Sequence, residues 1–231
     1  MRLIVITFLF FFISFSGSAQ SFELWSSAGV KYKLNKKIHF SGSFSSRFRD
    51  FKARTIFPEL TVKYKALKWM HISVDYRFVS KRENNGNYNG ANRINFNTKV
   101  KNNWDRLSYA MRIRYQMSAE AGSVGTYNSD FDRALRFKPE VSYDIKKSIF
   151  TPSISVEFFY NPNSGLYGNR IDKMRYTLGT DLELDGPHSF RIFTRIDHKI
   201  YDNNPTKFIL GFDYQLSLND ILSGNSKKGE L

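Results

Sequence analysis

Polar and apolar residues alternate along most of the chain. Between residues 22 and 34, Phe22 and Val30 fall on one face of an extended segment, whereas Glu23 and Lys31 fall on the other. A period of two is typical of a β-strand with one apolar and one polar face. The same alternation predicts ten further strands, near 38–49, 55–66, 69–81, 93–101, 106–117, 134–145, 150–160, 173–184, 188–200 and 206–217.

The apolar faces of these segments carry no Lys, Arg, Asp or Glu, and the opposite faces carry nearly all the charges of the strands. Each segment has about the length of a tilted strand that crosses a bilayer. Short connectors alternate with mostly longer ones. The short set is 35–37, 67–69, 102–105, 146–149 and 185–187, and the other set is 50–54, 82–92, 118–132, 161–172 and 202–205.

This layout predicts an all-β fold, an antiparallel up-and-down transmembrane β-barrel of 10–12 strands with short periplasmic turns and longer outer loops. Single-chain bacterial barrels have an even number of strands. Eleven segments therefore indicate that one segment lies outside the wall or that one has been overlooked. A soluble β-barrel or sandwich with its apolar face inward is the alternative fold.

The amino terminus has the layout of a secretory signal peptide. A basic start at Arg2 precedes an apolar run over 3–15, and small residues lie before an expected cleavage after Ala19. We therefore expect a signal peptide over 1–19, a barrel over 20–218 and a polar carboxyl-terminal tail over 219–231. Export and a barrel fold together predict the cell outer membrane of a Gram-negative bacterium.

Tight turns also predict which residues face each other across a hairpin. Opposite charges directly across a strand pair are favourable. The shortest turns produce five such pairs, which we predict to be structural ion pairs facing the lumen: Glu23 with Arg49, Glu59 with Arg77, Lys138 with Glu157, Arg175 with Asp197, and Asp181 with Arg191. A turn at 102–105 instead places Arg93 near Arg114. Three prolines lie inside predicted strands, and we expect Pro58, Pro139 and Pro152 near strand ends or at bulges.

Candidate chemistry is sparse. "VKYKLNKKIHF" (30–40) and "VKYKALKWMHI" (62–72) repeat one phrase, which places His39 and His71 just after tight turns on the polar face. Each histidine has a serine two residues later, a combination that a lipid-modifying enzyme could use. No third orienting residue and no metal-binding spacing accompany them. We therefore expect no enzyme activity, no cofactor, and no catalytic, cofactor-binding or metal-binding residue.

The net charge is +14, or +13 once Arg2 is removed with the signal peptide. In an exported protein this excess favours phosphate-rich lipid, lipopolysaccharide or small anions as partners, and not nucleic acid. Barrel-assembly machinery is the other expected contact. Surplus inward Arg and Lys favour either a narrow anion-preferring pore or a lumen closed by ion pairs. The alternatives are a membrane-embedded lipid-modifying enzyme and a soluble periplasmic binding protein.

Several stretches resemble a known family. They are Trp25, "YKLNKK" (32–37), "KMRYTLGTDLEL" (173–184) and "NNP" (203–205), and their order and spacing resemble the family named domain of unknown function 2490. Its members are regarded as outer-membrane β-barrels of Gram-negative bacteria. The resemblance implies that fold and that location over essentially the whole mature chain. It implies no activity, substrate or catalytic residue.

Overall fold

The computed structural model describes residues 21–83, 85–120, 133–163, 168–201 and 206–222. Eleven strands and one short helix lie within these ranges. They are β1 (Ser21–Lys33), β2 (Ile38–Arg49), β3 (Lys52–Lys65), β4 (Met70–Arg82), β5 (Tyr88–Trp104), β6 (Leu107–Glu120), β7 (Arg133–Tyr143), β8 (Phe150–Asn161), β9 (Arg170–Glu183), β10 (His188–Lys199), β11 (Lys207–Ser217) and α2 (Leu218–Leu222).

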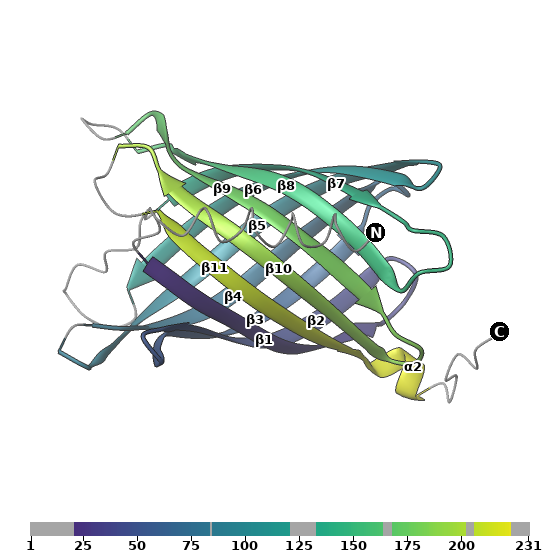
Figure 1. Cartoon of the computed structure of the whole chain (residues 1–231), viewed down its shortest axis with the longest axis horizontal. Coiled ribbons are helices and arrows are strands. Elements are labelled where there is room, and N and C mark those ends of the chain that lie inside the picture. Colours follow the sequence, from purple (N-terminus) through teal and green to yellow (C-terminus); the bar gives the residue numbers. More distant parts are fainter. Residues whose placement is uncertain (1–20, 84, 121–132, 164–167, 202–205, 223–231) are drawn as a thin grey trace, which may run out of the picture.

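The strands form one closed barrel, and they run obliquely to its long axis (Figure 1). Each strand is antiparallel to its neighbour in sequence, but β1 and β11 pair in parallel, from Ser21 opposite Lys207 to Lys31 opposite Ser217. The all-β barrel prediction is confirmed. The expectation of an even number of strands is wrong for the described part of the chain. All eleven segments belong to the wall, and an odd number closes because the first and last strands run in the same direction.

The two faces of the wall differ in polarity. Large apolar side chains are exposed on the outer face, among them Phe44, Leu60, Phe96 and Ile154. The inner face buries charged and amide side chains such as Glu157 at 3% exposure. This arrangement is the reverse of a water-soluble β-barrel, in which the apolar face fills the interior. Among the described residues, no helix is both long and apolar enough to cross a lipid bilayer.

The register of four hairpins is the predicted one. Trp25 lies opposite Arg47 in the first hairpin, and Glu59 lies opposite Arg77 in the second. The β7–β8 alignment pairs Arg136 with Phe159, which is the register expected from the 146–149 turn. The β9–β10 pairs likewise follow the register expected from the 185–187 turn. In these four hairpins, the shortest turn that brings opposite charges face to face therefore predicts the observed register.

The turn expected at 102–105 is wrong. β5 continues to Trp104, which pairs with Leu107, so only Asp105 and Arg106 connect β5 to β6. The new register moves Arg93 away from Arg114 and places it opposite Ser118, to whose hydroxyl it donates a hydrogen bond of 2.9 Å. Because the register moves by an even number of residues, every side chain keeps its face. The change separates Arg93 from Arg114 but places another like-charge pair, Lys99 and Arg112, opposite each other.

Two of the three prolines, Pro58 and Pro139, do not lie where they were expected. Pro58 pairs with Phe44 inside β3, and Pro139 pairs with Met111 inside β7. On its other side each proline interrupts the ladder, between β3 and β4 or between β7 and β8, and the register is the same before and after the gap. Since proline lacks only the N–H, one neighbour can pair normally while the other skips a bond. Only Pro152 lies near a strand end, in the third position of β8.

The predicted signal peptide at 1–19 lies outside the described residues, as do most of loop 118–132 and the end of the predicted tail. The tail begins with a feature that the sequence analysis did not predict, the helix α2. Within it, the side chain of Asn219 accepts a hydrogen bond of 2.5 Å from the Lys33 backbone N–H and donates one of 2.9 Å to the Lys33 carbonyl. These bonds fasten α2 to the end of β1.

Two glycines make room for an inward phenylalanine. Phe193 lies opposite Gly179 of β9 and Gly211 of β11, and it is only 3% exposed. A Cβ on Gly211 would overlap the Phe193 ring, and a Cβ on Gly179 would lie 3.0 Å from the Phe193 Cβ. The ring therefore packs directly over the Gly211 backbone, beside Trp25 and Ile209.

Replacing Gly211 with Ala should therefore destabilise the barrel by about 1–3 kcal/mol, because the ring must leave its site. The urea midpoint, followed by heat-modifiable electrophoretic mobility in detergent, measures this loss. Gly42→Ala is the matched control, since its Cβ would meet only Leu60 Cδ2 at 3.5 Å. Equal midpoints for the two variants would contradict the packing of Phe193 on Gly211.

Candidate functional site

A buried carboxylate on β8 joins three guanidinium groups from neighbouring strands. Glu157 accepts hydrogen bonds from Arg112 at 2.6 Å and from Arg136 at 2.8 Å and 3.1 Å, and an Arg175 nitrogen lies 3.8 Å away. Arg175 also donates two hydrogen bonds to Asp197, at 2.5 Å and 2.6 Å. The cluster therefore crosses the lumen side of β6 to β10.

A second buried cluster adjoins it at β6 and extends over β5, β4 and β3. Arg114 donates to Asp75 at 2.8 Å and to the Asn97 amide oxygen at 2.5 Å. The Asn97 amide nitrogen donates to Asp75 at 3.0 Å, and the Thr61 hydroxyl donates to the same carboxylate at 3.2 Å. Asp75 is 4% exposed and is therefore shielded from water.

Polar side chains therefore fill the middle of the barrel. A group that lined an open channel would be exposed to water, whereas these are buried: Asp75, Asn95, Asn97, Arg114, Gln116, Arg136, Ser153, Ser155, Glu157 and Thr177. Such charges are tolerated because each carboxylate meets guanidinium donors. The ion-paired belt, by which we mean the Glu157 and Asp75 clusters together, occupies the middle of the lumen.

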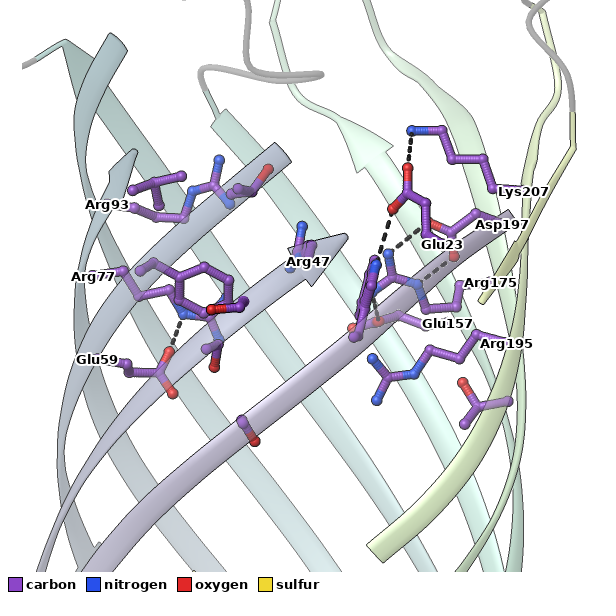
Figure 2. A pocket seen from close by; sticks show the side chains of 18 of the residues that line it. Glu23, Arg47, Glu59, Arg77, Arg93, Glu157, Arg175, Arg195, Asp197 and Lys207 are labelled. Atoms are coloured by element: carbon purple, nitrogen blue, oxygen red, sulfur yellow. Dashed lines mark hydrogen bonds and ion pairs between the residues drawn. The ribbon is translucent and has the colours of Figure 1, made fainter. Parts of the chain in front are cut away.

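A cavity of about 640 Å³ lies on one side of this belt. Arg112, Arg114, Arg136 and Glu157 form its floor, and its walls reach the barrel end at which β2 connects to β3 and β4 connects to β5. Fifteen basic residues line it against five acidic ones. It is therefore a strongly cationic chamber, and Figure 2 shows Arg47 between the Glu59–Arg77 pair and the group around Glu23, Arg175 and Arg195.

Aromatic rings interleave with these cations. The Arg47 Cζ lies 3.9 Å from the Trp25 ring centroid, and the Arg195 Cζ lies 3.7 Å from that of Phe193. Phe159 has Arg136 at 4.3 Å and Lys173 at 4.1 Å. Contacts of this length between a cation and a ring face are attractive, the more so away from water. The rings hold the cationic side chains in place where acidic partners are few.

The structure brings together four of the five predicted ion pairs. Glu23 meets Arg49, and Glu59 meets Arg77. Asp197 meets Arg175 as described above, and Asp181 meets Arg191 at 3.2 Å. Glu23 also accepts a hydrogen bond of 2.9 Å from the Trp25 indole, with Lys207 at 3.4 Å.

Lys138 and Glu157 do not form the predicted pair. Their strands are in the expected register, but Lys138 bonds Glu140 on its own strand at 2.6 Å, and Lys99 reaches the same carboxylate at 3.3 Å. Glu157 is occupied by arginines, whose forked donors match a carboxylate better than an ammonium does. The lysine therefore takes the neighbouring acid.

Sequence reasoning also missed the inward aromatic residues. Phe57, Phe159 and Phe193 lie on the charged faces of β3, β8 and β10, and all three are buried. An aromatic residue at a polar position of an alternating strand was the available signal. An aromatic residue at such a position predicts an inward ring that arginines of the lumen can contact.

The structure does not place His39 or His71 in a recognisable catalytic arrangement with other described residues. His39 and His71 face the lumen near the short turns, where Lys63 lies opposite His39 and Lys65 opposite His71. Ser73 belongs to the Asp75 cluster, because its hydroxyl accepts a hydrogen bond of 3.1 Å from Asn97. In the described ranges no group of three or more His, Cys, Asp or Glu residues is placed to hold a metal ion.

Fold and lumen together define a closed β-barrel protein with an apolar exterior and a charged, ion-paired interior. The chain belongs to the family described as "Protein of unknown function (DUF2490)", whose model matches residues 22–217. The family resemblance seen in the sequence is thereby confirmed.

Comparison with curated proteins finds no match. Among solved structures, one described as "Unveiling the Mechanism Behind the in-meso Crystallization of Membrane Proteins" has 13% sequence identity to this chain and a TM-score of 0.41. The similarity covers 80% of this chain and 77% of that one.

Proposed function

We propose that this protein is an outer-membrane β-barrel of a Gram-negative bacterium, with a lumen that admits anions at one end and conducts them poorly. The observation that carries the proposal is the polarity of the wall. Exposed Phe, Leu, Ile and Val cover the outside, while charged side chains are buried inside. A lipid environment makes that distribution favourable, which supports the proposal.

The lumen supports the second half of the proposal. Surplus arginine and lysine around a narrow passage favour anions over cations. The ion-paired belt leaves little room for flow, since most of its charged side chains are buried, although Arg112 keeps 24% side-chain exposure. A barrel of this kind stabilises the membrane or presents a binding chamber, and passage of small anions is slow.

The proposal assigns no chemistry to the barrel. Its expected partners are outer-membrane lipid and lipopolysaccharide around the apolar wall, and the assembly machinery during insertion. The apolar leader over 1–19 agrees with export. An enzymatic role for His39 and His71 gains no support from their lysine-rich surroundings, because a catalytic base needs an orienting acceptor.

Planar-bilayer recordings of the refolded mature protein test the proposal. We expect insertion with small conductance steps and a reversal potential in a salt gradient that reports anion preference. Replacing Asp75 and Arg114 together with Ser should raise the step size several-fold, because the change opens the belt without leaving a buried charge unpaired.

A rim pair supplies the control. Arg170 and Asp172 form a 2.7 Å salt bridge near the barrel end, outside the belt, and replacing both with Ser should leave the step size unchanged. Large steps in the native protein, or equal steps in the two double variants, would contradict a belt that closes the lumen. Failure to insert would contradict the membrane location.

A further inference from the structure

The guanidinium groups of Arg47 and Arg195, two of the arginines that line the chamber, form no salt bridge with a carboxylate among the described residues. The Nε atoms of Arg47 and Arg195 are buried and have no hydrogen-bond acceptor among the described residues. Their neighbours differ: Arg77 has Glu59 and Arg175 has Asp197. An arginine cannot lose its charge in a protein, so both cations persist, and described carboxylates such as Glu23 for Arg47 and Asp213 for Arg195 offset their charge only from beyond salt-bridge distance.

The same ring holds both of these guanidinium groups. The Trp25 centroid lies 3.9 Å from the Arg47 Cζ and 5.3 Å from the Arg195 Cζ. The indole is itself fixed by its hydrogen bond to Glu23. Phe57 supports Arg47 from another side at 5.1 Å, and Phe193 supports Arg195 at 3.7 Å. The rings restrain both side chains, so less conformational entropy is lost when they bind a ligand.

We propose that Arg47 and Arg195, held around Trp25, form a binding site for a phosphate monoester. Such a group carries about −1.5 to −2 charges at neutral pH, which matches two cations that form no salt bridge within the described chain. Guanidinium forks bind its oxygens in pairs. The inference rests on the proposed function only in that the chamber faces the outside of the cell.

The chamber has space for more than the phosphate. Its volume of about 640 Å³ lies within the range of about 300–1,000 Å³ that small-molecule sites occupy. Ser43 and Ser45 of β2 line the wall on the same face of the strand as Arg47. Hydroxyl groups both donate and accept hydrogen bonds, which suits a polyol. The predicted ligand is therefore a phosphorylated sugar or a similar polyhydroxy phosphate.

Tryptophan fluorescence in detergent micelles reads this site directly. The chain has three tryptophans, and Trp69 and Trp104 are exposed at 49% and 73%. In a Trp69→Phe, Trp104→Phe background, Trp25 alone reports on the chamber. We expect saturable changes in its emission with inorganic phosphate and, at lower concentration, with glucose 6-phosphate, at constant ionic strength set with chloride. Glucose should produce none.

Arg47→Gln and Arg195→Gln should each weaken glucose 6-phosphate binding at least about tenfold, the loss expected for a charged hydrogen bond. Arg106→Gln, in the β5–β6 turn at the other end of the barrel, is the control and should bind normally. Heat-modifiable mobility verifies that each variant is folded. Arg47→Lys keeps the charge but loses the fork, and it should bind with intermediate affinity.

A native barrel that responds to phosphate no more than to chloride would overturn the inference, whatever the variants do. So would equal weakening by Arg106→Gln. These failures are separate from failure of the proposed function, because binding in micelles needs no bilayer. A barrel that conducts without binding phosphate would contradict only the proposed phosphate site. A barrel that binds phosphate but never inserts into a bilayer would contradict only the proposed membrane location.

A competition experiment distinguishes a phosphate carried on a lipid from a soluble phosphate. Micelles doped with lipopolysaccharide present phosphorylated sugars on a lipid. Lipopolysaccharide that competes for the site lowers the apparent affinity for glucose 6-phosphate by the same factor in the native barrel and in the Arg106→Gln variant. In that case the site takes the lipid-borne group. If the affinity is unchanged, the site takes a soluble phosphate. Both results support the same chemistry at Arg47 and Arg195.

Discussion

Replacing Glu157 with Gln is expected to destabilise the barrel by about 3–5 kcal/mol, the cost of removing one partner from a buried ion pair. The substitution keeps the shape of the side chain and removes only its charge. Arg112, Arg136 and Arg175 all lie within 3.8 Å of the carboxylate. Of the three, only Arg175 has another carboxylate in salt-bridge distance among the described residues, and that is Asp197.

Asp181→Asn provides the comparison. It also removes a lumen carboxylate from an arginine, Arg191, but its side chain is 43% exposed. Water can solvate the remaining cation there, so the expected loss is below about 1 kcal/mol. Urea unfolding in micelles gives both values. A Glu157→Gln barrel as stable as Asp181→Asn would show that the belt does not depend on this carboxylate.

Replacing Phe96 with Arg is expected to lower the stability of the barrel in lipid vesicles by about 2–4 kcal/mol, the cost of an outward arginine at the bilayer midplane. Phe96 lies at the centre of β5, on the outer face between Val74 and Tyr115. Its side chain is 47% exposed. At an exposed site in water such a change stays within about 0.5 kcal/mol.

Trp104 is the matched position. It lies on the same face of the same strand, is 73% exposed, and ends β5 where the membrane interface is expected. Trp104→Arg should cost only about 0–1 kcal/mol in the same vesicles. The unfolding free energies of the two variants, measured by urea titration of vesicle-bound protein, give the depth dependence. Equal small costs at both positions would place the outer face in water.

The sequence predicts the wall of the barrel well, because alternation is a local property. The alternation within each strand indicates which residues lie on its two faces. A short turn between two consecutive strands then allows few possible registers. The β5–β6 hairpin was the exception for a physical reason. A shift of four residues keeps every side chain on its face, so alternation does not distinguish Asp105–Arg106 from a longer turn. The like charges of Arg93 and Arg114 do not distinguish the two turns either, because the observed register places Lys99 opposite Arg112.

The candidate site was predictable only where its contacts join neighbouring strands. Arg175 and Asp197 face each other directly, and the charges alone indicate the pair. Asp75 and Arg114 lie two strands apart, as do Lys99 and Glu140. Such contacts depend on the curvature of the closed barrel and on how far a long side chain reaches across it. The parallel closure of β1 on β11, which brings Lys207 to Glu23, depends on the whole strand count.

Separation of the cell envelope on a density gradient tests the membrane location most directly. Expressed from its full sequence in a Gram-negative host, the protein should sediment with the outer membrane, resist extraction by alkaline carbonate, and change its gel mobility on boiling. The account predicts all three together. Recovery in the soluble periplasmic fraction without detergent would contradict it, because the apolar outer face would then have to be stable in water.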